Sequence, residues 1–376
     1  MKHTHLHTHL LALLLCCALV LPLSACGEAK STTQQIFAMD TVMDLTAYGK
    51  KADDGINAAI SIINSMDTLL DPENERSKTY EINHAMGSPV VVNEQIAKML
   101  RTALTVYERT NGAFDLTTYP LSKLWGFIDQ NYRVPSDAEI ERLLPCVDMS
   151  KVQLAATDDS ANSLVTMPAD MALSFGAVAK GCASDYAIQA MRAAGVTSGV
   201  VSLGGNVQTL GKKPDGSDWN IAIQDPNDTG SYLGYLTVGE TAVITSGSYQ
   251  RYFQQDGQTY WHILDPETAA PARTGSYQRY FTEGGQKYHH ILSPTTGRPV
   301  NNGLLAVTIV CEDGTLADCL STAMFVLGPQ AALNYWRTYG GFEMLLVKAD
   351  GHVVLTNGLY GQFTPNGDSY VVDYAS

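Results

Sequence analysis

Ser246-Gly-Ser-Tyr-Gln-Arg-Tyr-Phe253 opens a stretch that the chain repeats 28 residues later as Thr274-Gly-Ser-Tyr-Gln-Arg-Tyr-Phe281. The first copy runs on to Tyr260-Trp-His-Ile-Leu-Asp-Pro266, and the second runs on to Tyr288-His-His-Ile-Leu-Ser-Pro294. Of the 28 positions, 16 are identical, where chance would give about two. The chain therefore contains either a site that is built twice or one element that was copied.

Length and charge bound the class of protein. The 376 residues suggest two lobes or domains and allow a large buried core. Apolar residues make up 45% and charged residues 16%, which argues against disorder. The net charge of −14 argues against a nucleic-acid partner, because phosphate backbones are bound by basic surfaces. A phosphorylated ligand is still compatible with this charge, since a metal ion and backbone N–H groups can hold its phosphates.

Residues 1–25 have the features of a lipoprotein signal peptide. The apolar run Leu10–Leu21 is shorter than the roughly 20 residues of a membrane-spanning helix. It ends in Leu23-Ser-Ala-Cys26, which resembles a bacterial lipobox, so we expect Cys26 to be lipidated after cleavage. Residues 26–35 would form a tether before a folded domain at 36–376. We expect a lipid anchor on the extracytoplasmic face of the cell membrane, with a secreted protein cleaved nearby as the alternative.

Hydrophobic periodicity predicts an α+β protein. Apolar residues recur at helical spacing in 52–70, 93–109, 183–194 and 316–327. Stretches rich in β-branched residues or alternating in polarity predict strands at 36–48, 218–224 and 304–310. The succession of these elements predicts a large, mostly antiparallel sheet system with flanking helices.

The segment Phe175-Gly-Ala-Val-Ala-Lys-Gly181 leads into a predicted helix. Its small residues let backbone N–H groups approach a ligand, a helix start favours an anion, and Lys180 adds a positive charge. The GxxxxGK[ST] spacing of a P-loop is absent, so a phosphate site and a tight packing turn both stay open. Leu203-Gly-Gly-Asn206 at the end of a predicted buried strand has two similar readings, a close backbone approach or a plain turn.

Asp318, Ser321 and Thr322 share one face of the predicted helix 316–327, because they stand at positions i, i+3 and i+4. A carboxylate with hydroxyl groups is a hard-oxygen set suited to Mg²⁺, which keeps phosphate oxygens in its shell. The alternative is an Asp N-cap beside a threonine. Ala113-Phe-Asp115 follows another helix and could hold an adenine and its ribose, or could simply place Phe114 in the core.

Together these motifs resemble one family, the FAD:protein FMN transferases (ApbE family), from about Phe37 to the C-terminus. The resemblance rests on segments that stand in family order: Phe37-Ala-Met-Asp-Thr41, Gly112-Ala-Phe-Asp115, Pro120-Leu121, Trp125-Gly-Phe127, Gly176-Ala-Val-Ala-Lys-Gly181, Leu203-Gly-Gly205, Thr245-Ser-Gly247, His289-His-Ile-Leu292, Thr296-Gly-Arg-Pro299 and Ala317-Asp-Cys-Leu-Ser-Thr322. It implies an ApbE-like fold with two lobes around a central FAD cleft. It also implies Mg²⁺-dependent transfer of FMN from FAD to a threonine hydroxyl of an acceptor flavoprotein, with release of AMP.

The resemblance also implies the roles of individual residues. The expected FAD contacts are Met39, Ala113, Phe114, Asp115, Ser174, Lys180, His290 and Ile291. The expected metal ligands are Asp318, Ser321, Thr322 and the backbone oxygen of Ala177. Asp318 is expected to be catalytic as well, helping to deprotonate the acceptor threonine. The acceptor would be a subunit of a membrane redox complex or an extracellular flavoprotein.

Two positions depart from the family pattern. Ser174 stands where the family usually has Asp, and the loop Asp71–Ser77 lacks the aromatic residue that relatives often place against the flavin. The family has one copy of the doubled stretch. We therefore predict a tandem duplication, 246–273 and 274–301, that adds one hairpin to a single site.

The second copy is expected to supply the FAD contacts, through His290 and Ile291. It is continuous with the strand that leads to Asp318. The equivalent of His290 in the first copy is His262, beside Trp261 instead of a second histidine.

Two other classes of protein are compatible with parts of the sequence. A surface lipoprotein that binds flavin or nucleotide but has lost catalysis would also explain a duplication beside the site. A solute-binding lipoprotein fits less well, because the parallel βαβ pattern of two-lobed binding proteins is missing. Covalent catalysis by a nucleophilic residue has no support, since there is no GxSxG elbow.

Overall fold

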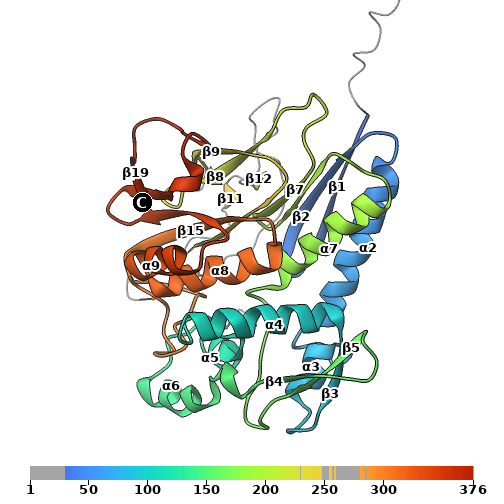
Figure 1. The fold of residues 1–376 in the computed structure, drawn as a ribbon. Helices are drawn as coiled ribbons and strands as arrows, with labels where there is room; N and C mark the ends of the chain where they lie inside the picture. The colour runs from blue at the N-terminus through green and yellow to red at the C-terminus, as the bar shows by residue number, and fades with distance from the viewer. Residues whose placement is uncertain are drawn as a thin grey trace, which may run out of the picture.

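The computed structural model describes residues 30–375 except 130, 229, 248–253, 256–257, 260–279 and 284–285. Its centre is a nine-stranded sheet in the order β1-β2-β6-β7-β10-β15-β16-β17-β19 (Figure 1). Neighbouring strands are antiparallel except for the parallel pair β17 and β19. The strands are β1 (Ser31–Ala38), β2 (Thr41–Tyr48), β6 (Gly199–Leu203), β7 (Asn206–Leu210), β10 (Ala242–Gly247), β15 (Leu304–Cys311), β16 (Glu343–Lys348), β17 (His352–Thr356) and β19 (Val371–Ala375). The predicted α+β class and mostly antiparallel sheet are confirmed.

Helices cover one face of this sheet and enclose the main core. The helices on the sheet are α2 (Ala52–Leu70), α7 (Ala179–Ala193), α8 (Gly314–Leu327) and α9 (Pro329–Tyr339), and α4 (Glu94–Arg109) packs on α8 and α7 and completes the core. In α2 the buried residues include Ile56, Ala59, Ile63 and Met66, the helical spacing expected for one apolar face. Helices α2 and α7 pack on each other, and α8 lies against β10 and β15 (Figure 1).

A three-stranded sheet, β18-β9-β8, covers the opposite face of the large sheet. Its strands are β8 (Trp219–Gln224), β9 (Tyr232–Val238) and β18 (Phe363–Pro365). Because side chains alternate along a strand, β16 contributes Met344 and Leu346 to the helix-covered core and Leu345 and Val347 to the other. Burial on both faces explains why such strands read as continuous apolar runs.

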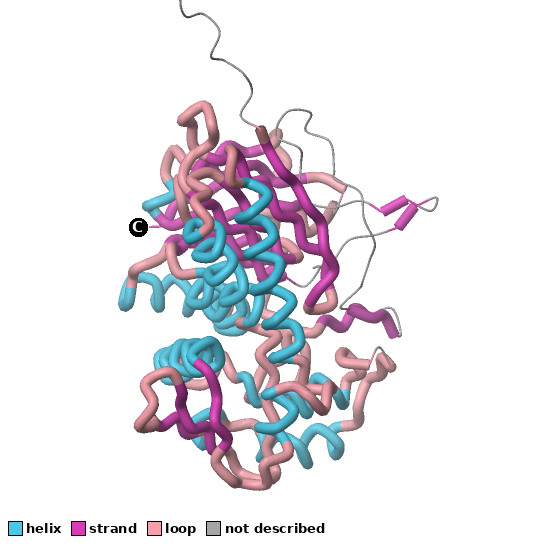
Figure 2. Tube along the Cα trace, turned by 90° about the vertical axis from the view of Figure 1, so that its right-hand side faces the viewer, coloured by secondary structure: helices cyan, strands magenta, loops and turns pink. Residues whose placement is uncertain are grey.

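The remaining elements lie on the side of α4 away from the large sheet (Figures 1 and 2). They are α3 (Lys78–Asn83), β3 (Val90–Asn93), α5 (Tyr119–Leu124), α6 (Asp137–Leu143), β4 (Gln153–Ala156) and β5 (Asn162–Thr166). The three strands pair in the order β3-β5-β4. Among the described helices, none is long and apolar enough to cross a membrane.

Two short hairpins lie in the doubled stretch. The first pairs β11 (Gln254–Gln255) with β12 (Gln258–Thr259), and the second pairs β13 (Tyr280–Glu283) with β14 (Gln286–His289). Gln254 pairs with Thr259 in the first, and Thr282 pairs with Lys287 in the second. These positions are equivalent at an offset of 28 residues, so both copies pair in the same register.

The predicted strand 36–48 is wrong in one respect, because it is a hairpin. Strands β1 and β2 are joined by Met39 and Asp40, with φ angles of 49° and 55°. Tight hairpin turns of this kind usually carry Asn-Gly, and Met39-Asp40 does not have this turn signal. The predicted tether 26–35 is also too long, since β1 begins at Ser31. The first residues of β1 are mostly exposed, because β1 is the edge strand of the sheet. They are polar and lack the alternation of a half-buried strand, so the sequence pattern did not predict them as a strand.

Two helices begin earlier than predicted. Helix α7 starts at Ala179 instead of Ala183, because its first turn consists of small residues that carry no apolar periodicity. Helix α8 starts at Gly314 with Asp313 as its N-cap, whose side chain accepts a hydrogen bond from the Leu316 N–H. The alternative reading of Asp318 as an N-cap is therefore wrong, since Asp318 lies inside the helix.

Candidate active site

One cleft of about 460 Å³ joins segments that are far apart in the sequence. Its walls come from the β1–β2 turn, the end of α2, the segment before α5, the segment before α7, the end of β10, the segment after β14, and α8. They include Met39, Ala113, Phe114, Asp115, Ser174, Ala177, Lys180, His290, Ile291, Asp318 and Thr322. The predicted binding residues of the described chain thus meet at one place, and only Ser321 lies behind the wall.

The β1–β2 turn brings Met39 to the cleft. The Met39 N–H donates a hydrogen bond to Asp67 Oδ1 of α2 at 2.7 Å. This bond ties a turn with two positive φ angles to the end of a long helix. The turn conformation, which is unfavourable for residues other than glycine, is therefore held by a contact within the cleft wall.

The segment Ala113–Asp115 forms another part of the cleft wall. Phe114 is only 2% exposed and belongs to the main core, so the core reading of this ring is confirmed. Asp115 Oδ1 accepts hydrogen bonds from the N–H and the hydroxyl of Thr117 at 2.7 and 2.6 Å. Its Oδ2 accepts one from the Met149 N–H at 3.0 Å. Burial raises the pKa of the Asp115 carboxyl, against the hydrogen bonds from Thr117 and Met149.

The segment from Ser174 to Gly181 forms the wall at the start of α7. Ser174 Oγ accepts a hydrogen bond from the Gly176 N–H at 3.2 Å. The first turn of α7 is closed by the bond from the Cys182 N–H to the Val178 carbonyl. The Gly181 N–H, which would reach back to Ala177 in a longer helix, donates to Asp318 Oδ2 at 2.8 Å instead. The Ala177 carbonyl therefore lies outside the helical hydrogen-bond ladder.

Asp318 is a buried carboxylate, 3% exposed, in the middle of α8. Besides the Gly181 N–H, its Oδ1 accepts a hydrogen bond from Asn206 Nδ2 at 2.9 Å. In the described part of the chain both of its donors are neutral. A buried carboxylate normally needs a cation or several donors to offset its desolvation, so this site favours a positively charged partner.

Three hydroxyl groups meet where β10 lies beside α8. Ser246 Oγ of β10 lies 2.8 Å from Ser321 Oγ and 3.2 Å from Thr322 Oγ1. Ser321 also donates to the Asp318 carbonyl at 2.9 Å and is fully buried. Thr322 lines the cleft, whereas Ser321 holds the wall through Ser246. Thr322 is therefore in a better position than Ser321 to be a direct metal ligand.

The donors at Asp318 fit a hard cation. Among the described residues there is no cluster of three or more His, Cys, Asp or Glu side chains that could hold a metal. The groups available are one carboxylate, the Thr322 hydroxyl and the Ala177 carbonyl, all of them oxygens. Mg²⁺ typically takes few protein ligands of this kind and completes its shell with water and phosphate oxygens.

The second copy of the doubled stretch reaches the cleft through His290 and Ile291. The His290 ring lies edge-on to Phe127, with 6.4 Å between ring centroids. His289 points inward, where its Nε2 is 2.8 Å from the Val300 carbonyl. His262, the equivalent residue of the first copy, and the predicted lipidation site Cys26 lie outside the described residues.

Several cleft residues were not predicted as site residues, among them Glu73, Tyr119 and Phe127. The Tyr119 hydroxyl donates a hydrogen bond to Glu73, which also pairs with Lys123 at 3.0 Å. The hydrogen bond from Tyr119 lowers the pKa of Glu73, while burial and Glu73 raise the pKa of Tyr119. The loop without an aromatic residue thus faces Tyr119 of α5. A contact between segments 46 residues apart leaves no pattern in the sequence.

Comparison with known proteins places this geometry in a family. The sequence model of the ApbE family matches residues 39–275 and 272–346, and the two segments overlap inside the doubled stretch. The chain is 28% identical over 313 residues to an FAD:protein FMN transferase from Klebsiella pneumoniae, covering 83% of this chain and 87% of that protein. It is 27% identical over 354 residues to an FAD:protein FMN transferase from Treponema pallidum, covering 89% and 90%.

Solved structures agree. The fold matches the crystal structure of the ApbE protein from Thermotoga maritima with a TM-score of 0.75 and 28% identity, over 89% of this chain and all of that one. It also matches the flavinyl transferase ApbE of Pseudomonas stutzeri with a TM-score of 0.71 and 24% identity, over 91% and 99%. The second likeness shows the fold alone. Because the family model covers most of the sequence and the predicted motifs meet in one cleft, the chain belongs to the ApbE family.

Proposed function

We propose that this chain transfers FMN from FAD to a threonine hydroxyl of an acceptor flavoprotein and releases AMP. The observation that carries the proposal is the position of Asp318 in a cleft that residues of the other family motifs also line. In the reaction the acceptor oxygen forms a bond to the phosphorus of the FMN half. The P–O bond to the bridging oxygen breaks, and AMP leaves with that oxygen and the bonding electrons.

The residues of the cleft would divide the work. We assign Asp318, Thr322 and the Ala177 carbonyl to Mg²⁺, with Ser321 in support through Ser246. When bound, the ion neutralises charge on the pyrophosphate. Asp318 would accept the proton of the acceptor threonine, a role that its position at the cleft allows. Lys180 lines the same cleft and would add positive charge near the phosphates.

The flavin half would be held by other residues that line the cleft. Met39, Ala113, Ser174, His290 and Ile291 line the cleft and are proposed to contact FAD. Phe114 and Asp115 are proposed to act mainly by shaping that wall, since the ring is in the core and the carboxylate accepts three hydrogen bonds from the chain. Positioning of this kind supplies much of the rate enhancement in phosphoryl transfer.

The assay for the proposal is incubation of the protein with FAD, Mg²⁺ and a threonine-bearing acceptor domain. We expect acid-stable flavin fluorescence on the acceptor with the wild type and none with Asp318→Ala. Asp373→Ala is the matched control, because Asp373 lies at the far edge of the sheet, paired with His352. No label with the wild type, or equal label with Asp318→Ala, would contradict catalysis. FAD binding without transfer would favour the alternative of a flavin-binding lipoprotein.

We further propose that the protein acts from the extracytoplasmic face of the cell membrane, held there by acyl chains on Cys26. The acceptor would then be a subunit of a membrane redox complex or an extracellular flavoprotein. The support is the order of apolar run, small residues and cysteine at the N-terminus. Cys26→Ala should move the protein from the membrane fraction to the soluble one, and retention in the membrane would contradict a lipid anchor.

A further inference from the structure

Helices α7 and α8 touch at two glycines. A Cβ atom on Gly181 would lie 2.1 Å from the Gly314 carbonyl oxygen and 2.7 Å from Asp318 Cβ. A Cβ atom on Gly314 would lie 2.8 Å from the Gly181 carbonyl oxygen and 2.9 Å from Asp185 Oδ1. No larger residue fits between the two helices at this point, so their backbones are in direct contact.

Two carboxylates hold this contact from opposite sides. Asp318 of α8 accepts the Gly181 N–H of α7 at 2.8 Å. Asp185 of α7 accepts the Gly314 N–H and the Thr315 N–H of α8 at 2.8 and 3.0 Å. The Thr315 hydroxyl adds a third bond at 2.6 Å. On each helix the aspartate follows its glycine by four residues, one turn. Each helix therefore donates backbone N–H groups to the aspartate of the other.

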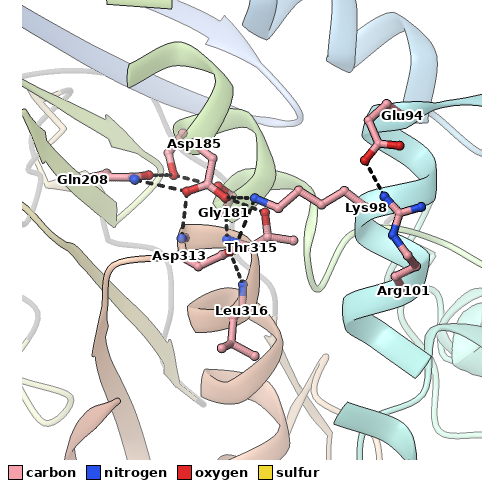
Figure 3. A network of polar contacts seen from close by, with 11 residues as sticks. Glu94, Lys98, Arg101, Gly181, Asp185, Gln208, Asp313, Thr315 and Leu316 are labelled. Atoms are coloured by element: carbon pink, nitrogen blue, oxygen red, sulfur yellow. Dashed lines mark hydrogen bonds and ion pairs between the residues drawn. The ribbon is translucent and has the colours of Figure 1, made fainter. Parts of the chain in front are cut away.

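Asp185 has a cation where Asp318 has none among the described residues. Lys98 Nζ of α4 lies 2.7 Å from Asp185 Oδ2 and 3.4 Å from Asp313 Oδ2 (Figure 3). Gln208 Nε2 donates to Asp185 Oδ1 at 3.1 Å. Burial raises the pKa of Asp185, but Lys98 and the bonds from Thr315 and Gly314 outweigh it and hold the pKa below its ordinary value. Asp185 is thus a charged group with its donors in place.

Helix α8 does not need Asp185 in order to begin. Its own N-cap, Asp313, accepts the Leu316 N–H at 2.9 Å. What Asp185 adds is a bond from another helix to the first turn of α8. Asp318 stands one turn further along, so a shift of this first turn moves its carboxylate in the cleft.

We propose that Asp185 and Lys98 are positioning residues for FMN transfer, which set the place of the Asp318 carboxylate by fixing the first turn of α8 against α7. This inference rests on the proposed function. Both residues lie outside the cleft wall, and neither needs to touch FAD. They should therefore affect turnover and metal binding and leave flavin affinity unchanged.

The test compares Lys98→Met with Arg101→Met. Arg101 is on the same helix and pairs with Glu94 at the surface, so it is a matched control (Figure 3). We expect Lys98→Met to lower kcat by about 10- to 100-fold, the usual effect of removing a residue behind a metal ligand. KM for FAD should change less than about twofold, because the contacts that bind FAD equally in the ground state and the transition state are intact. Lys98→Arg should restore most of kcat. If Lys98→Met lowered kcat no more than Arg101→Met does, the proposal would be overturned.

A second measurement does not depend on turnover. Mg²⁺ is titrated by calorimetry into each variant saturated with ADP, which carries a pyrophosphate group but no FMN to transfer. Lys98→Met should bind Mg²⁺ about tenfold more weakly than the wild type. Wild type that binds Mg²⁺ but labels no acceptor would contradict the proposed function and leave this comparison intact. Should Lys98→Met fail to fold, Thr315→Val decides, since it removes the 2.6 Å hydroxyl bond to Asp185 and leaves the backbone bond from the Thr315 N–H in place. Unchanged kcat and Mg²⁺ affinity in Thr315→Val would then overturn the proposal.

Discussion

His290 is the residue at which we test which copy of the doubled stretch contacts FAD, because the first copy has an equivalent histidine, His262. It lines the cleft beside Ile291 and lies edge-on to Phe127. We predict that His290→Ala weakens FAD binding roughly fivefold, the effect of losing one contact of about 1 kcal/mol. Fluorescence titration with FAD measures it. His352→Ala is the control, because His352 lies on β17 and pairs with Asp373 at the surface.

The same titration on His262→Ala tests the choice between the copies. His262 is the equivalent residue of the first copy, and its removal should leave FAD affinity close to that of the wild type. A larger loss from His262→Ala than from His290→Ala would assign the flavin contact to the first copy.

Single residues were predictable where the pattern is local. Asp318 and Thr322 were found because positions one helical turn apart share a face. Asn206 was noted only as part of a turn, and its bond to Asp318 spans 112 residues. Ser246 likewise meets Ser321 only because β10 lies beside α8. Contacts that depend on the packing of distant elements produce no regular residue spacing in the sequence, so they could not be predicted from it.

At the scale of elements, the contact between α7 and α8 at Gly181 and Gly314 leaves no room for a larger side chain. We predict that Gly181→Ala destabilises the protein by about 1–3 kcal/mol, the usual cost of overpacking a core. The added Cβ would sit 2.1 Å from the Gly314 carbonyl oxygen, so the helices must separate. Alanine is intrinsically better than glycine in a helix by about 1 kcal/mol, so the loss would appear against that preference. Urea unfolding measures the difference.

Gly239→Ala is the control for this substitution. A Cβ atom on Gly239 would have only Asp218 Oδ1 near it, at 3.9 Å. Its free energy of unfolding should stay close to that of the wild type. Equal stability of Gly181→Ala and Gly239→Ala would contradict a tight α7–α8 contact.

The elements themselves were predictable in proportion to their burial pattern. The long helices α2 and α4 show apolar residues at helical spacing and were placed almost to the residue. The start of α7 was missed because Ala179, Lys180 and Gly181 carry no such pattern. The β1–β2 turn was missed because Met39 and Asp40 adopt positive φ without a glycine. Tertiary contacts, such as the bond from Met39 to Asp67, supplied what local sequence did not.

At the scale of the whole molecule, the order of strands in the large sheet was not predictable. Strand β10 lies between β7 and β15, so the doubled stretch leaves the sheet from β10 and the chain returns to it at β15. This insertion point explains how an extra 28 residues could be accepted. The strands on either side pair with each other from Ala242 to Gly247 regardless of what lies between them.

Removing one period should therefore leave a folded protein, and the two possible deletions should differ. Deletion of 246–273 joins Thr245 to Thr274, so the position of Ser246 keeps a hydroxyl facing Ser321 and is followed by a glycine as before. We predict that this variant keeps its unfolding temperature within a few degrees and still transfers FMN. Thermal unfolding and the acceptor-labelling assay measure both.

Deletion of 274–301 removes the same length but keeps the first copy, which lacks what the site requires. Gly297 has a φ of +64°, and a Cβ atom there would lie 2.6 Å from Ile140 Cγ2, yet the first copy has Ala269 at this position. His289, which bonds the Val300 carbonyl, would be replaced by the larger Trp261. We expect this variant to unfold at a lower temperature and to lose most FMN transfer. If it instead outperformed the deletion of 246–273, the first copy would be the working hairpin and the second the addition.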